Sequence, residues 1–255
     1  MKVFFLSLGC DKNLCDSEHM LKYLLSDGFV FTDVEEEADV AVINSCSFIG
    51  DAKKESIDET FRIAALKREG NLKALIVTGC LPERYKDSFM DELPEVDACL
   101  GINDWDRISE VVKDALQGKR TGCFSDSERL PVSKGRVVTG GGYSSYLKIA
   151  EGCDKRCTYC AIPFIRGAYR SVPMEELVKE ASELALSGVR ELNLVAQETT
   201  RYGIDLYGKK MLPELIAELS GIDGIHWIRV LYCYPEEITD DLVAVLKTNS
   251  KVVPY

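Results

Sequence analysis

Three cysteines lie within eight residues of the chain, at Cys153, Cys157 and Cys160, in the spacing Cys-x3-Cys-x2-Cys. A zinc site usually takes four ligands and presents them as two separated pairs, so this cluster fits zinc poorly. A four-iron cluster held by three thiolates keeps one iron open to another ligand. The spacing therefore predicts an iron–sulfur site in preference to buried or disulfide-bonded cysteines that meet by chance.

A second set of cysteines is spread along the first eighty residues. Cys10, Cys46 and Cys80 each follow directly after an apolar run that is typical of a buried strand. In doubly wound sheets, ligands bind outside the carboxyl ends of the parallel strands, where loops that are distant in sequence converge. We therefore predict a second three-cysteine metal site. The alternative is that each is a structural cysteine at a strand end, since Cys is often buried.

The apolar pattern of residues 1–120 predicts an α/β domain with a doubly wound parallel sheet. Strands are expected at residues 3–8, 38–43, 73–78 and 98–100. Helices are expected from Asp16 or Ser17 to Leu25, and over residues 51–67, 82–90 and 105–116.

Residues 121–143 are predicted to be a linker. The glycine triplet Gly140–Gly142 is not followed by Lys-Ser or Lys-Thr, which favours a flexible joint over a phosphate-binding loop.

The apolar pattern of residues 144–255 predicts further βα units. Strands are expected at 145–150, 191–196 and 226–231, helices at 173–186, 212–219 and 240–247, and another apolar run begins at Val252. This repetition is typical of the N-terminal part of a (βα) barrel, whose sites lie at the carboxyl ends of the strands. About three and a half units cannot close a barrel, so we expect an incomplete barrel in a piece of a longer protein.

The composition restricts the classes of function. The chain has 255 residues, a formal net charge of −11 and ten cysteines. The acidic balance argues against a nucleic-acid-binding surface, which usually needs a basic patch. No run of eighteen apolar residues is present, so no membrane span is predicted. Many cysteines without a clear secretory signal indicate a reducing compartment, and a cytoplasmic location is expected.

Several segments carry a resemblance to a known family, the radical S-adenosylmethionine (SAM) methylthiotransferases. They are Gly9–Asn13, Cys153–Cys157, Ala161–Gly167, Tyr169–Ser171, Val195–Gly203 and Asp205–Gly208. Within the family these segments resemble the branch that modifies a ribosomal protein. The resemblance extends over residues 1–255, whereas the rest of the barrel and the family's C-terminal TRAM domain are absent from the chain.

The resemblance implies a role for both cysteine sets. Cys153, Cys157 and Cys160 would be the catalytic ligands of a [4Fe–4S] cluster whose open iron binds SAM, and cleavage of SAM would yield a 5′-deoxyadenosyl radical. Cys10, Cys46 and Cys80 would hold an auxiliary [4Fe–4S] cluster that carries the sulfur to be inserted. The implied reaction is methylthiolation of an aspartate β-carbon in small-subunit ribosomal protein twelve, with electrons from a flavodoxin- or ferredoxin-type protein.

Further residues are candidates for contact with SAM. Gln197 and Glu198 are expected at the end of the second barrel strand, and Arg229 and Tyr232 border the third. Arg166 and Arg170 are expected to be solvated, as exposed arginines usually are. The remaining cysteines are expected to pack in the core or to be surface thiols.

Two other functions remain open. One is the tRNA-adenosine branch of the same family. The acidic composition disfavours this branch, because an acidic chain attracts a basic ribosomal protein more readily than it attracts tRNA. The other is a non-catalytic iron–sulfur module for electron transfer.

Overall fold

The computed structural model describes residues 1–70, 72–126 and 128–253, and the chain forms two compact units. Unit 1 consists of residues 1–137 together with Phe164–Arg166. Unit 2 consists of residues 138–163 and 167–255. Within the described residues, no helix has the length and apolar character needed to cross a membrane.

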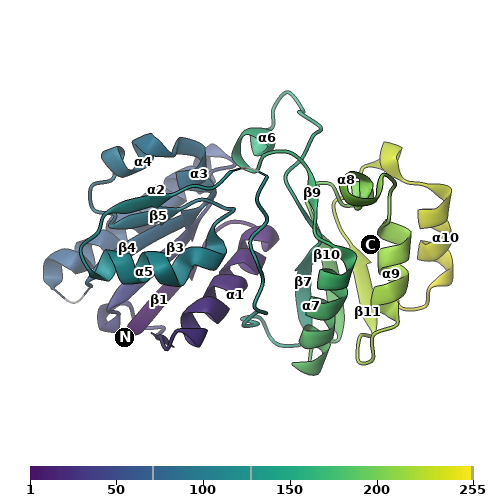
Figure 1. Ribbon diagram of the computed structural model, residues 1–255, viewed down its shortest axis with the longest axis horizontal. Coiled ribbons are helices and arrows are strands. Elements are labelled where there is room, and N and C mark those ends of the chain that lie inside the picture. Colours follow the sequence, from purple (N-terminus) through teal and green to yellow (C-terminus); the bar gives the residue numbers. More distant parts are fainter. Residues whose placement is uncertain (71, 127, 254–255) are drawn as a thin grey trace. The chain divides into compact units, whose positions relative to one another are not determined.

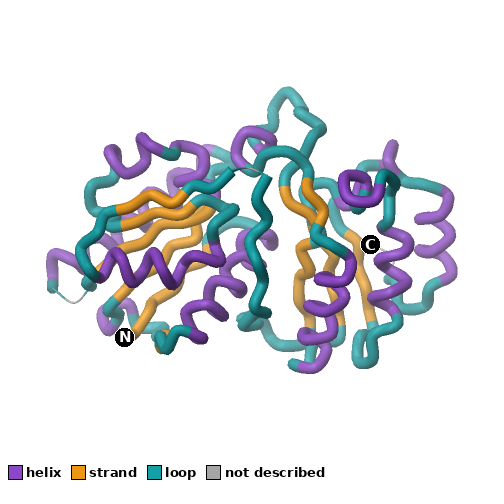
Figure 2. Tube along the Cα trace, in the orientation of Figure 1, coloured by secondary structure: helices purple, strands orange, loops and turns teal. Residues whose placement is uncertain are grey.

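Unit 1 contains a six-stranded parallel sheet with the strand order β2-β1-β3-β4-β5-β6 (Figure 1 and Figure 2). Its strands are β1 (Lys2–Ser7), β2 (Val30–Phe31), β3 (Val40–Ser45), β4 (Ala74–Gly79), β5 (Ala98–Leu100) and β6 (Thr121–Cys123). The direction of strand order reverses between β1 and β3. Such a switch point opens a crevice outside the carboxyl ends of these strands, where doubly wound sheets bind ligands.

Helices cover both faces of this sheet (Figure 1). They are α1 (Asp11–Ser26), α2 (Gly50–Glu69), α3 (Cys80–Tyr85), α4 (Asp87–Glu92) and α5 (Ile108–Leu116), with short 3-10 turns at η1 (Glu35–Glu37) and η2 (Trp105–Arg107). Side chains alternate between the faces along each strand. Val40 and Val42 of β3 therefore pack with α1 and α5, and Ala41 and Ile43 pack with α2, α3 and α4. Both faces are buried, which explains the continuous apolar strands.

The first helix begins earlier than the sequence predicts. Cys10 is its N-cap in extended conformation, and Asp16 and Ser17 lie buried inside the helix instead of capping it. Ser17 Oγ lies 2.7 Å from Ser7 Oγ and accepts a hydrogen bond of 2.9 Å from Asn44 Nδ2. The first turns of α1 bury polar residues, so they lack the periodic apolar residues by which the start of a helix is recognised in a sequence.

The predicted linker also starts too early. Residues 121–123 form the edge strand β6, which pairs with β5. Arg129 Nη2 then donates to Asp106 Oδ2 at 2.7 Å, and Tyr23 Oη donates to the Val132 carbonyl at 2.7 Å. These contacts bind residues up to Val137 to unit 1. A three-residue strand containing glycine gives almost no sequence signal.

Unit 2 contains a three-stranded parallel sheet with the order β11-β10-β7. Its strands are β7 (Ser144–Lys148), β10 (Glu191–Val195) and β11 (Trp227–Val230). The helices of unit 2 are α7 (Met174–Leu186), α8 (Ile204–Tyr207), α9 (Leu212–Ser220) and α10 (Asp240–Thr248). Short 3-10 turns lie at η3 (Thr199–Arg201) and η4 (Pro235–Glu237). A two-stranded antiparallel ribbon joins β8 (Ala150–Glu151) to β9 (Arg170–Ser171). The helix α6 (Ile162–Ile165) lies where the chain passes from one unit to the other.

The predicted α/β class is confirmed. Unit 1 is a doubly wound parallel sheet, and unit 2 has the consecutive parallel βα units of an incomplete barrel. In the apolar run from Val252, Val252 forms a parallel bridge with Ile228. Pro254 and Tyr255, which complete that predicted run, lie outside the described residues.

Gly79 should be intolerant of a side chain, because it joins β4 to α3 at φ +92°. A Cβ there would lie 2.6 Å from the Ser45 carbonyl oxygen and closer still to Asn44 Oδ1. We expect Gly79→Ala to destabilise unit 1 by roughly 2–4 kcal/mol, through positive-φ strain and overpacking. Urea unfolding followed by Trp105 fluorescence in a Trp227→Phe background measures this.

Gly28→Ala is the matched control for this prediction. Gly28 also has a positive φ, +85°, but nothing lies within 4 Å of the Cβ position. Gly28→Ala should lower the free energy of unfolding by roughly 1 kcal/mol, which is the cost of the positive φ alone. Equal losses in the two variants would show that the crowding at Gly79 is unimportant.

Candidate functional site

The carboxyl ends of β1, β3 and β4 carry the first cysteine set. Cys10 caps α1 two residues beyond Leu8, Cys46 follows β3 directly, and Cys80 begins α3. The three strands are neighbours in a parallel sheet, so their carboxyl ends lie at one edge. The predicted position of all three cysteines beyond parallel strand ends is confirmed.

Asn13 lies between two of these thiols. Its Oδ1 is 4.0 Å from Cys10 Sγ and 3.8 Å from Cys80 Sγ. Its Nδ2 donates to the carbonyl oxygens of Leu8 at 3.1 Å and Ser45 at 3.0 Å. These two bonds fix the amide, so that its oxygen faces the thiols. Sequence reasoning missed Asn13, because a polar residue in the first turn of a helix is common.

Cys46 is held against the backbone of the first loop. A Cβ on Gly9 would lie 2.9 Å from Cys46 Cβ and 3.3 Å from its Sγ, so only glycine permits this approach. Ser56 Oγ accepts a hydrogen bond from Cys46 N at 3.0 Å and donates one to Cys46 O at 2.9 Å. These two hydrogen bonds hold the Cys46 backbone to α2.

Arg166 also reaches this site. Its Nη2 donates to Asn13 Oδ1 at 2.6 Å and contacts Cys80 Sγ at 3.4 Å, and its Nη1 lies 3.7 Å from Asp16 Oδ2. The side chain is only 1% exposed. The expectation that Arg166 is solvated is therefore wrong. Arg166 follows a short apolar run, and nothing in the sequence indicates that it is buried beside Cys80, which is 86 residues away along the chain.

The expectation for Arg170 is wrong as well. It is buried in β9, and its Nη1 donates to the Ala168 carbonyl oxygen at 2.9 Å.

Burial and charge act in opposite directions on the thiol of Cys80. Burial raises its pKa to about 11, and the neighbouring thiols of Cys10 and Cys46 act in the same direction. The Arg166 guanidinium lowers the pKa, because it stabilises the thiolate. The thiol is therefore neutral at pH 7, and a bound metal would have to displace its proton.

All three candidate metal donors of the first site are thiols. Across residues 1–70, 72–126 and 128–253, no three His, Cys, Asp or Glu side chains are close enough to hold one metal ion. A donor set of thiols alone suits iron–sulfur chemistry.

The second cysteine set lies in the loop between β8 and α6. Cys153 N donates to the Gly167 carbonyl oxygen at 3.1 Å, and Tyr169 N donates to Asp154 Oδ1 at 3.0 Å. Both bonds tie the loop to the chain just before β9. Cys153 is buried, whereas Cys157 and Cys160 are half-buried. The loop is thus fixed at its base and open towards its other two thiols.

Lys155 anchors the same loop to the end of the barrel sheet. Its Nζ donates to Glu237 Oε1 at 2.5 Å, lies 3.9 Å from Glu198 Oε2, and sits 4.9 Å from the centre of the Tyr234 ring. Hydrogen bonds from Lys155 and Lys210 lower the pKa of Glu237 to about 2. Glu237 therefore keeps its charge throughout the neutral range. Charged residues between cysteines usually suggest a solvated loop, so this anchor was not predicted.

Tyr234 contacts the central thiol of this set. Its Oη lies 3.8 Å from Cys157 Sγ, and this contact, followed by burial, raises the pKa of the Tyr234 phenol. The phenol is therefore protonated and able to donate to a thiolate. Nothing in the sequence singles out Tyr234 from the other tyrosines.

Of the four residues predicted to contact SAM, Gln197, Glu198 and Tyr232 lie at the carboxyl ends of the unit 2 strands, and Arg229 points away from them. Glu198 is fully buried near the cysteine loop, and its Oε1 accepts a hydrogen bond from the Thr200 hydroxyl. Burial raises the pKa of Glu198. Burial, and after it the charge of Glu198, also raises the pKa of Cys153. Gln197 precedes it and is half-buried.

Tyr232 and Arg229 differ from each other in position. Tyr232 follows β11, is half-exposed and has a positive φ of 60°, and its carbonyl oxygen accepts from Thr199 N at 3.1 Å. Arg229 Nε instead donates to Glu191 Oε1 at 2.9 Å. Glu191 is the first residue of β10, so Arg229 points towards the amino ends of the strands, opposite to Glu198.

Four cysteines belong to neither set. Cys15, Cys99 and Cys123 are buried, and Cys233 is half-buried. Burial raises the pKa of Cys99 to about 12 and that of Cys123 to about 11. Such thiols are inert at neutral pH, which agrees with a packing role.

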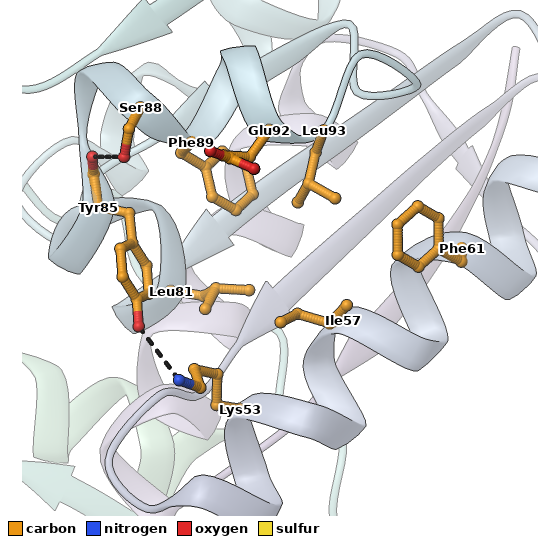
Figure 3. A pocket seen from close by; sticks show the side chains of 9 residues that line it. All are labelled: Lys53, Ile57, Phe61, Leu81, Tyr85, Ser88, Phe89, Glu92 and Leu93. Carbon is orange, nitrogen blue, oxygen red and sulfur yellow. Dashed lines mark hydrogen bonds between the residues drawn. The ribbon is translucent and has the colours of Figure 1, made fainter.

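A cavity of about 340 Å³ lies between α2, α3 and α4 of unit 1 (Figure 3). Its wall is mainly apolar, and Lys53 Nζ donates to Tyr85 Oη at 3.3 Å at one end. None of its nine lining residues is a cysteine or another predicted site residue. The cavity is therefore separate from the thiol sites.

Two family descriptions match the chain. Residues 2–101 match the Uncharacterized protein family UPF0004, and residues 147–253 match the Radical SAM superfamily. The second match covers the Cys153–Cys160 loop and the βα units that follow it.

Curated relatives match the whole chain. The ribosomal protein uS12 methylthiotransferase RimO of Lachnoclostridium phytofermentans is 59% identical over 256 residues, and that of Clostridium tetani is 46% identical. Each match covers 100% of this chain and 58% or 57% of the relative. The chain thus spans a little over half the length of these relatives.

Among solved structures, the radical SAM methyltransferase TsrM of Kitasatospora setae superposes with a TM-score of 0.65 at 12% identity. The match covers 96% of this chain and 57% of TsrM. At this identity the likeness shows the fold alone. In sequence, the whole chain is similar to the RimO methylthiotransferases, and residues 147–253 match the Radical SAM superfamily.

Thiol reactivity should separate the exposed Cys10 of the first set from the buried Cys99. In metal-free protein at pH 8, we expect iodoacetamide to modify Cys10 at least about a hundredfold faster than Cys99. Cys10 is exposed, whereas Cys99 is buried and its pKa of about 12 leaves very little thiolate. Raising the pH should speed the modification of Cys99. Peptide mass spectrometry measures both rates, and equal rates would contradict the burial of Cys99.

Proposed function

We propose that this chain carries the two iron–sulfur centres of a ribosomal-protein methylthiotransferase. Unit 1 is the auxiliary-cluster domain, and unit 2 is the N-terminal part of the radical-SAM partial barrel. The reaction is insertion of sulfur and a methyl group at an aspartate β-carbon of ribosomal protein uS12. The names of the relatives support this substrate, and the activity is that of the whole protein.

The observation that carries the proposal is the presence of two three-thiol sets in two separate units. Cys10, Cys46 and Cys80 lie at the carboxyl edge of the unit 1 sheet, and the second set lies in one loop of unit 2. A non-catalytic electron carrier needs only one cluster whose irons are all ligated by protein. Two sets with three thiols each leave an open iron in both, as an enzyme that binds SAM and a sulfur atom requires.

Cys153, Cys157 and Cys160 hold the radical-SAM cluster in this proposal. With SAM bound, the cluster would supply hydrogen abstraction from an unactivated carbon, which acid–base side chains cannot perform. The chain's own residues fix the geometry. Lys155 holds the loop to Glu237, and the Tyr234 hydroxyl lies 3.8 Å from the Cys157 sulfur, to which it would donate.

Gln197, Glu198 and Tyr232 are proposed to contact SAM from the carboxyl ends of β10 and β11. Glu198 is suited to accept hydrogen bonds from an ammonium group, because it is buried beside the cysteine loop and Lys155 lies 3.9 Å away. The ion pair of Arg229 with Glu191 gives that arginine a structural part instead.

Cys10, Cys46 and Cys80 hold the auxiliary cluster, and Gly9 and Gly79 let the backbone approach it closely. The net charge of −11 supports a basic ribosomal protein as substrate in preference to tRNA. The electrons for SAM cleavage come from a flavodoxin- or ferredoxin-type protein in this proposal.

The division of roles between the two sets predicts different losses of activity. We expect Cys153→Ala, Cys157→Ala and Cys160→Ala each to lower SAM cleavage by about a hundredfold or more, because the open iron is lost. Cys10→Ala, Cys46→Ala and Cys80→Ala should leave cleavage within about twofold of wild type and abolish sulfur insertion. Release of 5′-deoxyadenosine measures cleavage, and Cys99→Ala is the matched control. Equal loss of cleavage in both sets would overturn the division.

The substrate assignment is tested by mass spectrometry with the whole, anaerobically reconstituted protein, SAM and a reductant. A gain of one methylthio group on an aspartate of uS12 is the expected result. A gain on tRNA alone would assign the protein to the tRNA-modifying branch. Iron signals that do not respond to SAM, with no 5′-deoxyadenosine, would instead indicate an electron carrier.

A further inference from the structure

Arg166 brings a positive charge into direct contact with the first cysteine set. Its Nη2 is 3.4 Å from Cys80 Sγ and 2.6 Å from Asn13 Oδ1. Arg166 follows Cys160 by six residues, yet Phe164–Arg166 belong to unit 1. The segment after the radical-SAM loop thus supplies a charged group to the auxiliary site.

The surroundings of Arg166 hold its guanidinium in one orientation. Asn13 Oδ1 accepts from it, and the Asn13 amide is itself fixed by the carbonyl oxygens of Leu8 and Ser45. Asp16 Oδ2 lies 3.7 Å from Nη1 and adds a negative charge beside the guanidinium. The Nη2 group of Arg166 faces both the Cys80 thiol and Asn13.

Burial makes the charge of Arg166 matter. A cluster held by three thiolates carries net negative charge, and reduction adds one more negative charge. In a poorly solvated interior such charge is costly unless a nearby cation or N–H donor compensates for it. Hydrogen bonds to the cluster sulfurs and nearby charges set the reduction potentials of iron–sulfur centres.

We infer that Arg166 is a positioning residue of the auxiliary site, which donates a hydrogen bond to the Cys80 sulfur and favours the reduced cluster. This inference rests on the proposed function, because it takes Cys10, Cys46 and Cys80 as cluster ligands. Its sign is fixed by electrostatics. A positive charge stabilises the more negative, reduced state, so removal of Arg166 shifts the midpoint potential to a more negative value.

The experiment isolates one cluster and changes one charge. Cys153, Cys157 and Cys160 are replaced by Ala in the full chain, so that iron binds only at the first cysteine set. Arg166→Met and Arg166→Lys are then made in this background. After anaerobic reconstitution with iron and sulfide, potentiometry followed by electron paramagnetic resonance gives the midpoint potential.

Arg136→Met is the matched control. Arg136 is also a buried arginine of unit 1 with a side chain 1% exposed, and its Nε lies 3.5 Å from Glu18 of α1. Its carboxylate partner is therefore on the same helix as Asp16, but no thiol is involved in that ion pair. We expect Arg166→Met to shift the potential to a more negative value, and Arg166→Lys and Arg136→Met to remain near the parent.

Three results of the potential measurement would overturn the inference. They are an unchanged potential in Arg166→Met, an equal shift in Arg136→Met, and equal shifts in Arg166→Met and Arg166→Lys. If Arg166→Met retains no iron, the Arg166→Lys variant tests the inference instead. Iron retained in Arg166→Lys supports the role of the positive charge, and loss of iron from both folded variants contradicts that role. Circular dichroism checks the folding.

Failure of the proposed function gives a different result. If the parent with all three loop cysteines replaced binds no iron, the first cysteine set is not a cluster site, and both proposals fall. If the parent holds a cluster and Arg166→Met leaves its potential unchanged, only the inference on Arg166 falls.

Discussion

The parallel pairing of β1, β3 and β4 is the constraint on which the site in unit 1 depends. Cys10, Cys46 and Cys80 are separated by more than thirty residues each, and only the shared direction of their strands places them at one edge. The order of the sheet reverses between β1 and β3, which opens the crevice at that edge. Gly9 and Asn13 then adjust the final approach of the thiols.

The cysteine loop of unit 2 depends on a different kind of constraint. Its thiols are neighbours in sequence, so no sheet is needed to bring them together. What the fold adds is anchoring, since Lys155 binds carboxylates that follow β10 and β11 and Tyr234 contacts Cys157. The buried Glu198 and the half-exposed thiols thus share the carboxyl end of the strands, the usual place for sites in such barrels.

The parts of the site that follow from regular strands could be predicted from the sequence. The three cysteines after apolar runs were placed correctly, because a buried parallel strand has a strong pattern. Arg166, Asn13 and Tyr234 could not be found, since their importance arises from tertiary contacts and not from local spacing. The early start of α1 and the short strand β6 were missed because buried polar residues and a three-residue edge strand carry weak patterns.

In the proposed function the chain holds two separate iron–sulfur clusters, one for each set of three thiols. Iron and sulfide analysis of the anaerobically reconstituted chain counts these clusters. We expect about eight iron atoms per chain, because each four-iron cluster contributes equally, and about four after replacement of either cysteine set by Ala. About four irons in the intact chain, or zinc in place of iron, would contradict the account.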